Sequence, residues 1–232
     1  MGQAIGETIF DAFYLLGVIP LGIIMIVKSK KWDQYRWFGI MAVVLGSGDS
    51  FHLIPRLIAL WGTGIDANVV SLGIGKLITS ITMTIFYLIL FYIYRMRYEI
   101  KGQRYLDISI WALGLARVIL CCFPENKWTS LDAPLSWGIY RNIPFALMGI
   151  EIIVLFALKA KEDKDFRFMA LTIILSFGFY IPVVIWAEQV SWVGSLMIPK
   201  TCAYVWTILI GFMAQRKELQ KMKGIDQNEK AS

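Results

Sequence analysis

Charged residues are scarce in this sequence. Asp, Glu, Lys and Arg make up 17% of its 232 residues, whereas hydrophobic residues make up 57%. Soluble domains average about 25% charged residues and about 45–50% apolar ones. The mean hydropathy of +0.61 agrees with this imbalance. We therefore expect an integral membrane protein with several spans rather than a soluble domain.

Histidine and cysteine are also scarce, which limits the available chemistry. His52 is the single histidine, so a metal site built from several histidines is excluded. Cys121 and Cys122 are adjacent and Cys202 lies in another apolar stretch, so the three cysteines give no disulfide framework. The sequence contains no glycine-rich phosphate loop and no nucleophile elbow. We expect neither a metal nor a cofactor.

Long apolar stretches, in contrast, are abundant. A bilayer core needs about 20 consecutive apolar residues per helix. Seven windows meet this requirement: residues 8–27, 37–60, 69–94, 106–123, 137–158, 168–187 and 193–214. They predict an all-α integral membrane domain of seven transmembrane helices over residues 1–215, followed by a basic cytoplasmic tail over residues 216–232.

Basic residues are distributed unevenly between the predicted loops. The turns 28–36, 95–105 and 159–167 hold four Lys or Arg each, and the tail adds five, which places seventeen on one side. The loops on the other side hold only Lys127. Because cytoplasmic loops carry the excess of Lys and Arg, we expect an outside N-terminus and a cytoplasmic C-terminus in a bacterial plasma membrane. Basic residues that flank apolar spans indicate a lipid bilayer as partner, and no nucleic acid.

The order of polar residues and prolines suggests a duplication. Prolines occur in spans 1, 2, 5 and 6, and Lys76 and Lys200 enter spans 3 and 7 at similar depths. This order predicts a 3+1+3 parallel repeat, a plan of small transporters that bind substrate near the midplane. In architecture alone it resembles the SWEET sugar carriers and the KDEL receptor, but no Pro-Gln pair marks span 1 or 5. Lys200 is similar to the retinal-binding lysine of microbial rhodopsins, but Leu196 stands where those proteins carry Asp.

Five cationic side chains lie inside the predicted spans. They are Arg56, Lys76, Arg117, Arg141 and Lys200. A charge at the bilayer centre costs about 2.5–3.5 kcal/mol on insertion scales, so such residues usually face one another or a wet cavity. Their acidic company in the same spans is Asp49 and Glu151. The surplus of positive charge predicts a binding site for an anionic ligand, mostly in the outer half of the bundle.

Residues 46–56, GSGDSFHLIPR, form the densest polar segment of any span. Spacings of three and four place Asp49, His52 and Arg56 on one face of a helix. Asp49 could orient and charge His52 as a proton-relay pair or a general base. The alternative is a polar clamp in which an arginine neutralises Asp49. Ser50 points away from this face on a straight helix.

Three further residues are candidates for gating or coupling. Glu151 lies in the inner half of span 5, where it could pair with Arg117, gate the cytoplasmic side or carry a proton. Tyr180 and Tyr204 could line the same cavity as the cations.

Three functions fit these residues. The first is a carrier or binding protein for an anionic solute or lipid headgroup, held by the five cations in an outward-facing cavity, with Asp49 and His52 as a proton or gating element. The second is an intramembrane hydrolase that acts on lipid, with His52 as the base and Asp49 as its orienting carboxylate. The third is a seven-helix sensor or receptor. The sequence does not decide between transport, catalysis and sensing, and a homo-oligomer is compatible with each; we favour the first function.

Overall fold

The computed structural model describes residues 2–29, 32–62, 64–187 and 189–231, and these residues form helices without any strand. The α-helices are α1 (Gly2–Lys28), α2 (Gln34–Trp61), α3 (Val69–Arg97), α4 (Arg104–Cys122), α5 (Leu135–Lys159), α6 (Met169–Trp186) and α7 (Met197–Ala231). Three short 3-10 helices lie in the connections: η1 (Asp66–Asn68), η2 (Pro124–Asn126) and η3 (Ser191–Leu196).

The seven predicted spans correspond to these seven helices, each long and apolar enough to cross a membrane. All but one of the predicted boundaries, the start at residue 69, differ from the ends of the helices, most of them by a few residues. Phe123 caps α4 rather than extending it, and α6 is one residue shorter at each end than predicted. Residues 193–196 belong to η3, so α7 begins later than the predicted span. The predicted tail continues α7 as helix as far as Ala231.

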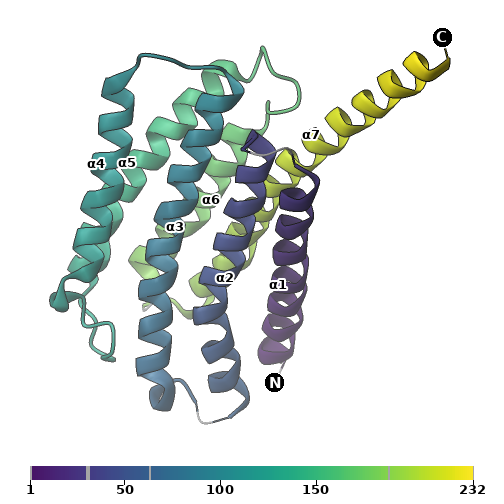
Figure 1. Cartoon of the computed structure of the whole chain (residues 1–232). Coiled ribbons are helices and arrows are strands. Elements are labelled where there is room, and N and C mark those ends of the chain that lie inside the picture. The colour runs from purple at the N-terminus through teal and green to yellow at the C-terminus, as the bar shows by residue number, and fades with distance from the viewer. Residues whose placement is uncertain (1, 30–31, 63, 188, 232) are drawn as a thin grey trace.

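Consecutive helices pack side by side, and α7 returns to contact α1 and α2 (Figure 1). Helix α4 lies at the edge of the bundle, beside α3 and α5. The turns after α1, α3 and α5 lie at the same end as the C-terminus, and the N-terminus lies at the other (Figure 1). We call the first the basic end, because its turns and tail hold the clustered Lys and Arg. That the basic end faces the cytoplasm stays a prediction.

Large apolar side chains cover the outside of the bundle. On α1, Phe13, Leu16 and Val27 are 78, 76 and 77% exposed, and on α4, Ile108 and Trp111 are 68 and 61% exposed. Soluble monomers rarely expose contiguous apolar surface of this kind, whereas lipid tails contact it at no cost. The surface therefore fits an integral multi-pass membrane protein.

The prolines of spans 1, 2, 5 and 6 all lie inside helices. They are Pro20, Pro55, Pro144 and Pro182. A proline leaves the carbonyl one turn earlier without its helical donor. Helices α1–α3 and α5–α7 flank α4 in the order that a 3+1+3 repeat requires, but the repeat itself stays a prediction.

Glycines bring α2 close to both of its neighbours. A Cβ atom on Gly48 would collide with the Thr82 side chain of α3, and one on Gly46 would lie 2.6 Å from Ile19 of α1. On α3, a Cβ atom on Gly75 would collide with the Phe51 carbonyl oxygen of α2. Neighbouring helices therefore fill the space beside these glycines, and α2 is held at the centre of the first three helices.

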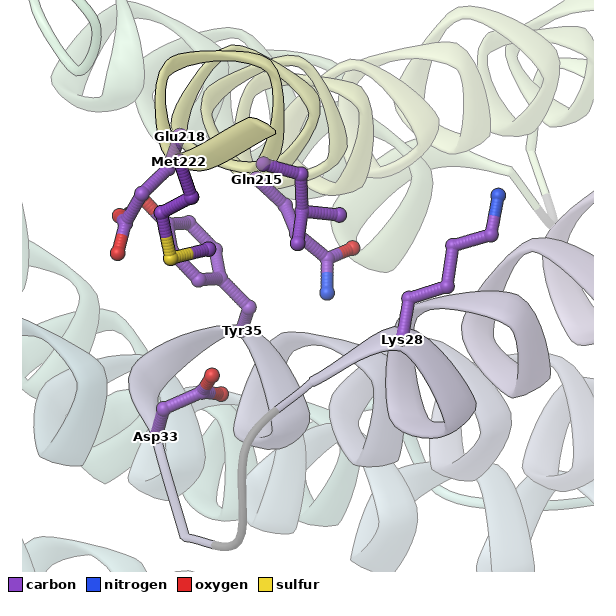
Figure 2. Close-up of a pocket in the computed structure, with 7 residues that line it drawn as sticks. Lys28, Asp33, Tyr35, Gln215, Glu218 and Met222 are labelled. Atoms are coloured by element: carbon purple, nitrogen blue, oxygen red, sulfur yellow. The ribbon is translucent and has the colours of Figure 1, made fainter. Parts of the chain in front are cut away.

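Side chains of α7 fasten that helix to the turn between α1 and α2 (Figure 2). Gln215 is buried, and its Nε2 donates to the Met25 carbonyl at 3.0 Å and to Ser29 Oγ at 2.8 Å. The Tyr35 hydroxyl donates to Glu218 at 2.7 Å. The space between these groups measures about 20 Å³, which holds about one water molecule. These hydrogen bonds therefore hold α7 against α1 and α2, and the space between them is too small for a ligand.

An ion pair holds the turn between α5 and α6 against α3. Arg97 Nε donates to Asp163 Oδ2 at 2.8 Å and Arg97 Nη2 donates to Oδ1 at 3.2 Å. The Tyr98 hydroxyl donates to the same carboxylate at 3.2 Å. Burial opposes ionisation of Asp163, but the hydrogen bonds and charge of Arg97 outweigh it and lower the pKa of this carboxyl below its ordinary value.

Candidate functional site

Arg56, a predicted ligand-binding residue, forms an ion pair within the protein. Its Nε donates to Glu7 Oε2 at 2.8 Å and its Nη2 donates to Glu7 Oε1 at 3.1 Å. This two-point geometry matches guanidinium to carboxylate and is among the stronger polar contacts of proteins. Arg56 therefore joins α2 to the start of α1, and its charge is already neutralised.

Helix α1 contributes acidic and phenolic groups that the sequence interpretation missed. Asp11 is only 6% exposed and interacts electrostatically with Glu7, Arg56 and Asp49. The Tyr14 hydroxyl, buried in the same helix, donates to Asp49 Oδ2 at 2.7 Å. Asp49 and Glu151 are therefore not the only acids within the spans. The signal was present in the sequence, because residues 7, 11 and 14 lie on one helix face at spacings of four and three.

Asp49 and His52 do not act as an orienting pair in this structure. Asp49 accepts the Tyr14 hydrogen bond, while His52 Nδ1 is buried and without a hydrogen-bond partner among the described residues. His52 interacts electrostatically with Lys76, Arg56 and Lys200.

Arg117 is the most deeply buried cation of the five. Its side chain projects from α4, is 2% exposed, and places its guanidinium carbon 3.2 Å from the centre of the Phe145 ring on α5. Its Nε and Nη1 are buried and have no hydrogen-bond partner within the described part of the chain. Tyr180, Cys121 and Tyr204 interact electrostatically with it, and Cys121 is also a side-chain hydrogen-bond partner. Arg117 takes part in none of the ion pairs formed among the described residues. Arg117 thus presents unused donors inside the bundle.

Lys200 enters the same interior from α7 and is 6% exposed. Its ammonium lies 4.7 Å from the centre of the Tyr180 ring and 5.2 Å from that of Tyr204. It interacts electrostatically with both Asp49 and Arg117. It takes part in none of the ion pairs that the described residues form. Lys200 therefore lies between an acid on α2 and a second cation on α4.

Arg141 continues the cationic region along α5. Its Nη1 donates to Asn126 Oδ1 at 2.9 Å, and its guanidinium carbon lies 4.3 Å from the centre of the Trp128 ring. Tyr180 interacts electrostatically with Arg141 as well as with Arg117, and donates its hydroxyl to Asn142 Oδ1 at 3.0 Å. Tyr180 is therefore the common neighbour of three cations, Arg117, Arg141 and Lys200.

Two other predicted site residues lie outside this cluster. The side chain of Lys76 is exposed, but its charge interacts electrostatically with His52. Glu151 accepts a hydrogen bond from Ser109 Oγ at 2.5 Å, and its Oε2 is buried without a partner within the described residues. Ser109, rather than Arg117, is thus the partner of Glu151, and this contact joins α4 to α5 nearer the basic end.

The polar interior is divided by sign. Acidic groups gather on α1 and α2, where Glu7, Asp11 and Asp49 outnumber Arg56. Arg117 and Arg141 lie on α4 and α5 without an acidic partner among the described residues, and Lys200 lies between the two regions. On the cationic side, Arg117 Nε and Nη1 are the buried donors that have no acceptor within the described residues.

The described residues contain no group of three or more His, Cys, Asp or Glu side chains that could hold a metal ion.

Comparison of the chain with models of known protein families, with curated proteins and with solved structures finds no match in any of the three.

Proposed function

We propose that this protein is a membrane carrier or binding protein for a small anion, held by Arg117, Lys200 and Arg141 around Tyr180. The anion is a solute or the headgroup of a lipid. The basic end faces the cytoplasm of a bacterial cell in this proposal, so the ligand enters from outside. Arg56 is excluded from the site because Glu7 neutralises it.

The state of Arg117 is the observation that carries the proposal. Burying a charged group without a partner costs several kcal/mol, yet the guanidinium is 2% exposed and two of its nitrogens lack acceptors. Stacking on Phe145 offsets a part of this cost, about 2 kcal/mol for a desolvated cation. A carboxylate or phosphate would offset more, because its oxygens match the planar guanidinium in two-point geometry.

Asp49 is the candidate for coupling in this proposal. It is held by Tyr14 and interacts electrostatically with Lys200. An anion that binds Lys200 competes with Asp49 for the ammonium. Asp49 would lose this partner when the anion binds, and this exchange is the proposed coupling.

The hydrolase hypothesis receives less support. Asp49 binds Tyr14 instead of His52, and Ser50 Oγ donates to the Ser47 carbonyl at 2.6 Å. No carboxylate therefore orients His52, and no serine is aligned with it. The sensor hypothesis gains no specific support from the described residues.

Thermal unfolding of the purified protein in detergent, with a panel of anions, tests the proposal. The panel holds phosphate, carboxylates, nucleotides and lysophospholipids. A ligand at 100 times its dissociation constant stabilises the folded state by about 2.7 kcal/mol, so even weak binding raises the unfolding temperature. We expect at least one anion to do so for the wild-type protein, and the shift to disappear in Arg117→Gln.

Arg56→Gln is the matched control, because it removes the same charge from a neighbouring part of the bundle. It should lower the unfolding temperature of the free protein but leave the ligand-induced shift intact. If no anion stabilises the wild-type protein, or if both variants lose the shift equally, the buried cations are structural and the proposal is wrong.

A further inference from the structure

A groove lies at the basic end between the start of α6 and the middle of α7. Its volume is about 260 Å³. The lining residues come from the turn before α6 and from one side of α7: Lys164, Asp165, Arg167, Phe168, Trp206, Ile210, Met213, Ala214 and Lys217. The groove shares no residue with the cluster around Tyr180.

The rim of the groove is cationic. Lys164, Arg167 and Lys217 all have exposed side chains. Asp165 is the acidic residue of the lining, and its Oδ1 accepts from Lys217 Nζ at 2.7 Å. It also lies 4.0 Å from Arg97. Three cations on the rim and a carboxylate that is already paired leave positive charge available for an anionic group.

The walls of the groove are apolar and aromatic. Met213 is 56% exposed and Phe168 is 42% exposed, while Ile210 forms a buried floor. The ring centres of Phe168 and Trp206 are 5.9 Å apart, and the guanidinium carbon of Arg167 lies 4.5 Å from the centre of the Phe168 ring. The cationic rim and the apolar wall are therefore in direct contact.

The α7 side of the groove has a polarity gradient along the helix. Residues 206, 210, 213 and 217 follow one another at spacings of four, three and four, so they form a single stripe. Trp206, Ile210 and Met213 are apolar, and Lys217 ends the stripe at the basic end. The stripe covers about 16 Å at 1.5 Å per residue. This order matches a phospholipid, with an acyl chain along the apolar part and a charged headgroup at the end.

We propose that this groove binds an anionic glycerophospholipid of the leaflet at the basic end. Its phosphodiester lies between Arg167, Lys217 and Lys164, and one acyl chain lies along Trp206 and Met213. Basic pockets between transmembrane helices recognise anionic headgroups in this way. The site does not depend on the proposed anion site, because neither Arg117 nor Lys200 contributes to it.

The test compares the protein in phosphatidylcholine nanodiscs with and without phosphatidylglycerol. Two quantities are measured: the unfolding temperature, and the amount of lipid that stays bound to the protein in native mass spectrometry. The site variant is the double substitution Lys164→Gln and Arg167→Gln, which leaves the Lys217–Asp165 pair in place. The control is Lys101→Gln with Arg104→Gln, which removes two exposed charges of the same end, away from the groove. A third variant, Met213→Glu, places a carboxylate in the exposed wall.

We expect phosphatidylglycerol to raise the unfolding temperature and to stay bound in the wild-type and control proteins. The site variant and Met213→Glu should each lose most of this effect, with at least a tenfold weaker retention of the lipid. Equal losses in the site variant and the control would show general attraction to an anionic surface and overturn the proposal. Equal stabilisation by glycerol phosphate in phosphatidylcholine discs would overturn the requirement for a lipid.

Discussion

At the scale of single residues, the arginines of this protein differ in how their charge is balanced. Arg97 and Arg56 each hold a carboxylate in two-point geometry. Arg117 is more deeply buried than either, but it has an aromatic ring and no carboxylate as its neighbours. A residue kept in this state lowers the stability of the free protein, which is typical of groups retained for binding.

Arg117→Met should therefore leave the free energy of unfolding of the ligand-free protein unchanged or raise it, by up to about 2 kcal/mol. Methionine keeps contact with Phe145 and removes an unpaired charge. Arg97→Met should lower the same quantity by about 1–3 kcal/mol, because it removes the cation that pairs with Asp163 and leaves the Tyr98 hydroxyl as a neutral donor. Unfolding in detergent, followed by tryptophan fluorescence, measures both. A loss for Arg117→Met as large as that for Arg97→Met would identify Arg117 as structural.

Of the five cations predicted inside the spans, Arg117 and Lys200 are buried, whereas Lys76 is exposed. The partners of these charges could not be read from the sequence. A charge within a long apolar window is visible without a structure, which is why Arg117 and Lys200 were correctly placed inside helices. Which charges meet depends on how each helix is rotated and how closely it packs. The pairing of Arg56 with Glu7, and of Asp49 with Tyr14, joins helices whose relative rotation the apolar pattern leaves undefined.

At the scale of helices, α2 and α3 owe their close approach to glycine. A Cβ atom on Gly75 would collide with the Phe51 carbonyl oxygen and would lie 2.7 Å from the His52 Cα atom. These backbone atoms of α2 cannot rotate away. The same methyl group on Gly178 of α6 would meet no atom within 4 Å. Substitution at Gly75 therefore tests the effect of helix packing on stability, whereas substitution at Gly178 tests the effect of helix propensity alone.

Gly75→Ala should lower the free energy of unfolding by about 1–3 kcal/mol, the usual cost of overpacking. Gly178→Ala should have no effect or raise it by up to about 1 kcal/mol, because alanine favours the helix. Unfolding temperatures of the two variants, measured side by side, check this contrast. Equal effects would mean that α2 and α3 can separate without cost.

The turn between α5 and α6 gives a prediction on pH. Arg97 lowers the pKa of Asp163 in the folded protein, whereas an unfolded Asp has a pKa of about 3.9. The unfolded chain therefore binds more protons between these two values, and the stabilisation by Asp163 is complete above about pH 5 and lost as the pH falls through the folded value.

Asp163→Asn should accordingly be less stable than the wild-type protein at pH 7, and this difference should shrink below about pH 4. The control is Glu162→Gln, since the Glu162 side chain is 65% exposed and pairs with Lys159 one turn earlier. Such a surface pair contributes less than about 1 kcal/mol, so its removal should change little at any pH. Unfolding temperatures of the wild-type protein and both variants, measured from pH 7 to pH 3, test this prediction. A constant difference between Asp163→Asn and wild type would show that Asp163 does not titrate in this way.

At the scale of the whole molecule, charge divides the protein twice. Along the bundle axis, the basic end carries seventeen Lys and Arg in its turns and tail, and the loops of the other end carry Lys127. Across the bundle, Glu7, Asp11 and Asp49 lie on α1 and α2, and Glu151 lies apart from them on α5. Arg117 and Arg141 lie on α4 and α5 and form no ion pair within the described part of the chain. By the positive-inside rule, the first division predicts how the chain inserts. The second division is the basis of the proposed anion site. The proposal that an anion reaches Arg117 from outside depends on both.

The orientation can be tested directly with single cysteines in a variant whose native cysteines are replaced by serine. Glu125 in η2 and Lys161 beside α5 have exposed side chains at opposite ends of the bundle. Because seventeen basic residues favour retention of their end in the cytoplasm, a membrane-impermeant maleimide added to intact cells should label Glu125→Cys and spare Lys161→Cys. After the cells are opened, both variants should react equally. The reverse pattern would place the basic end outside, and an anion would then reach Arg117 from the cytoplasm.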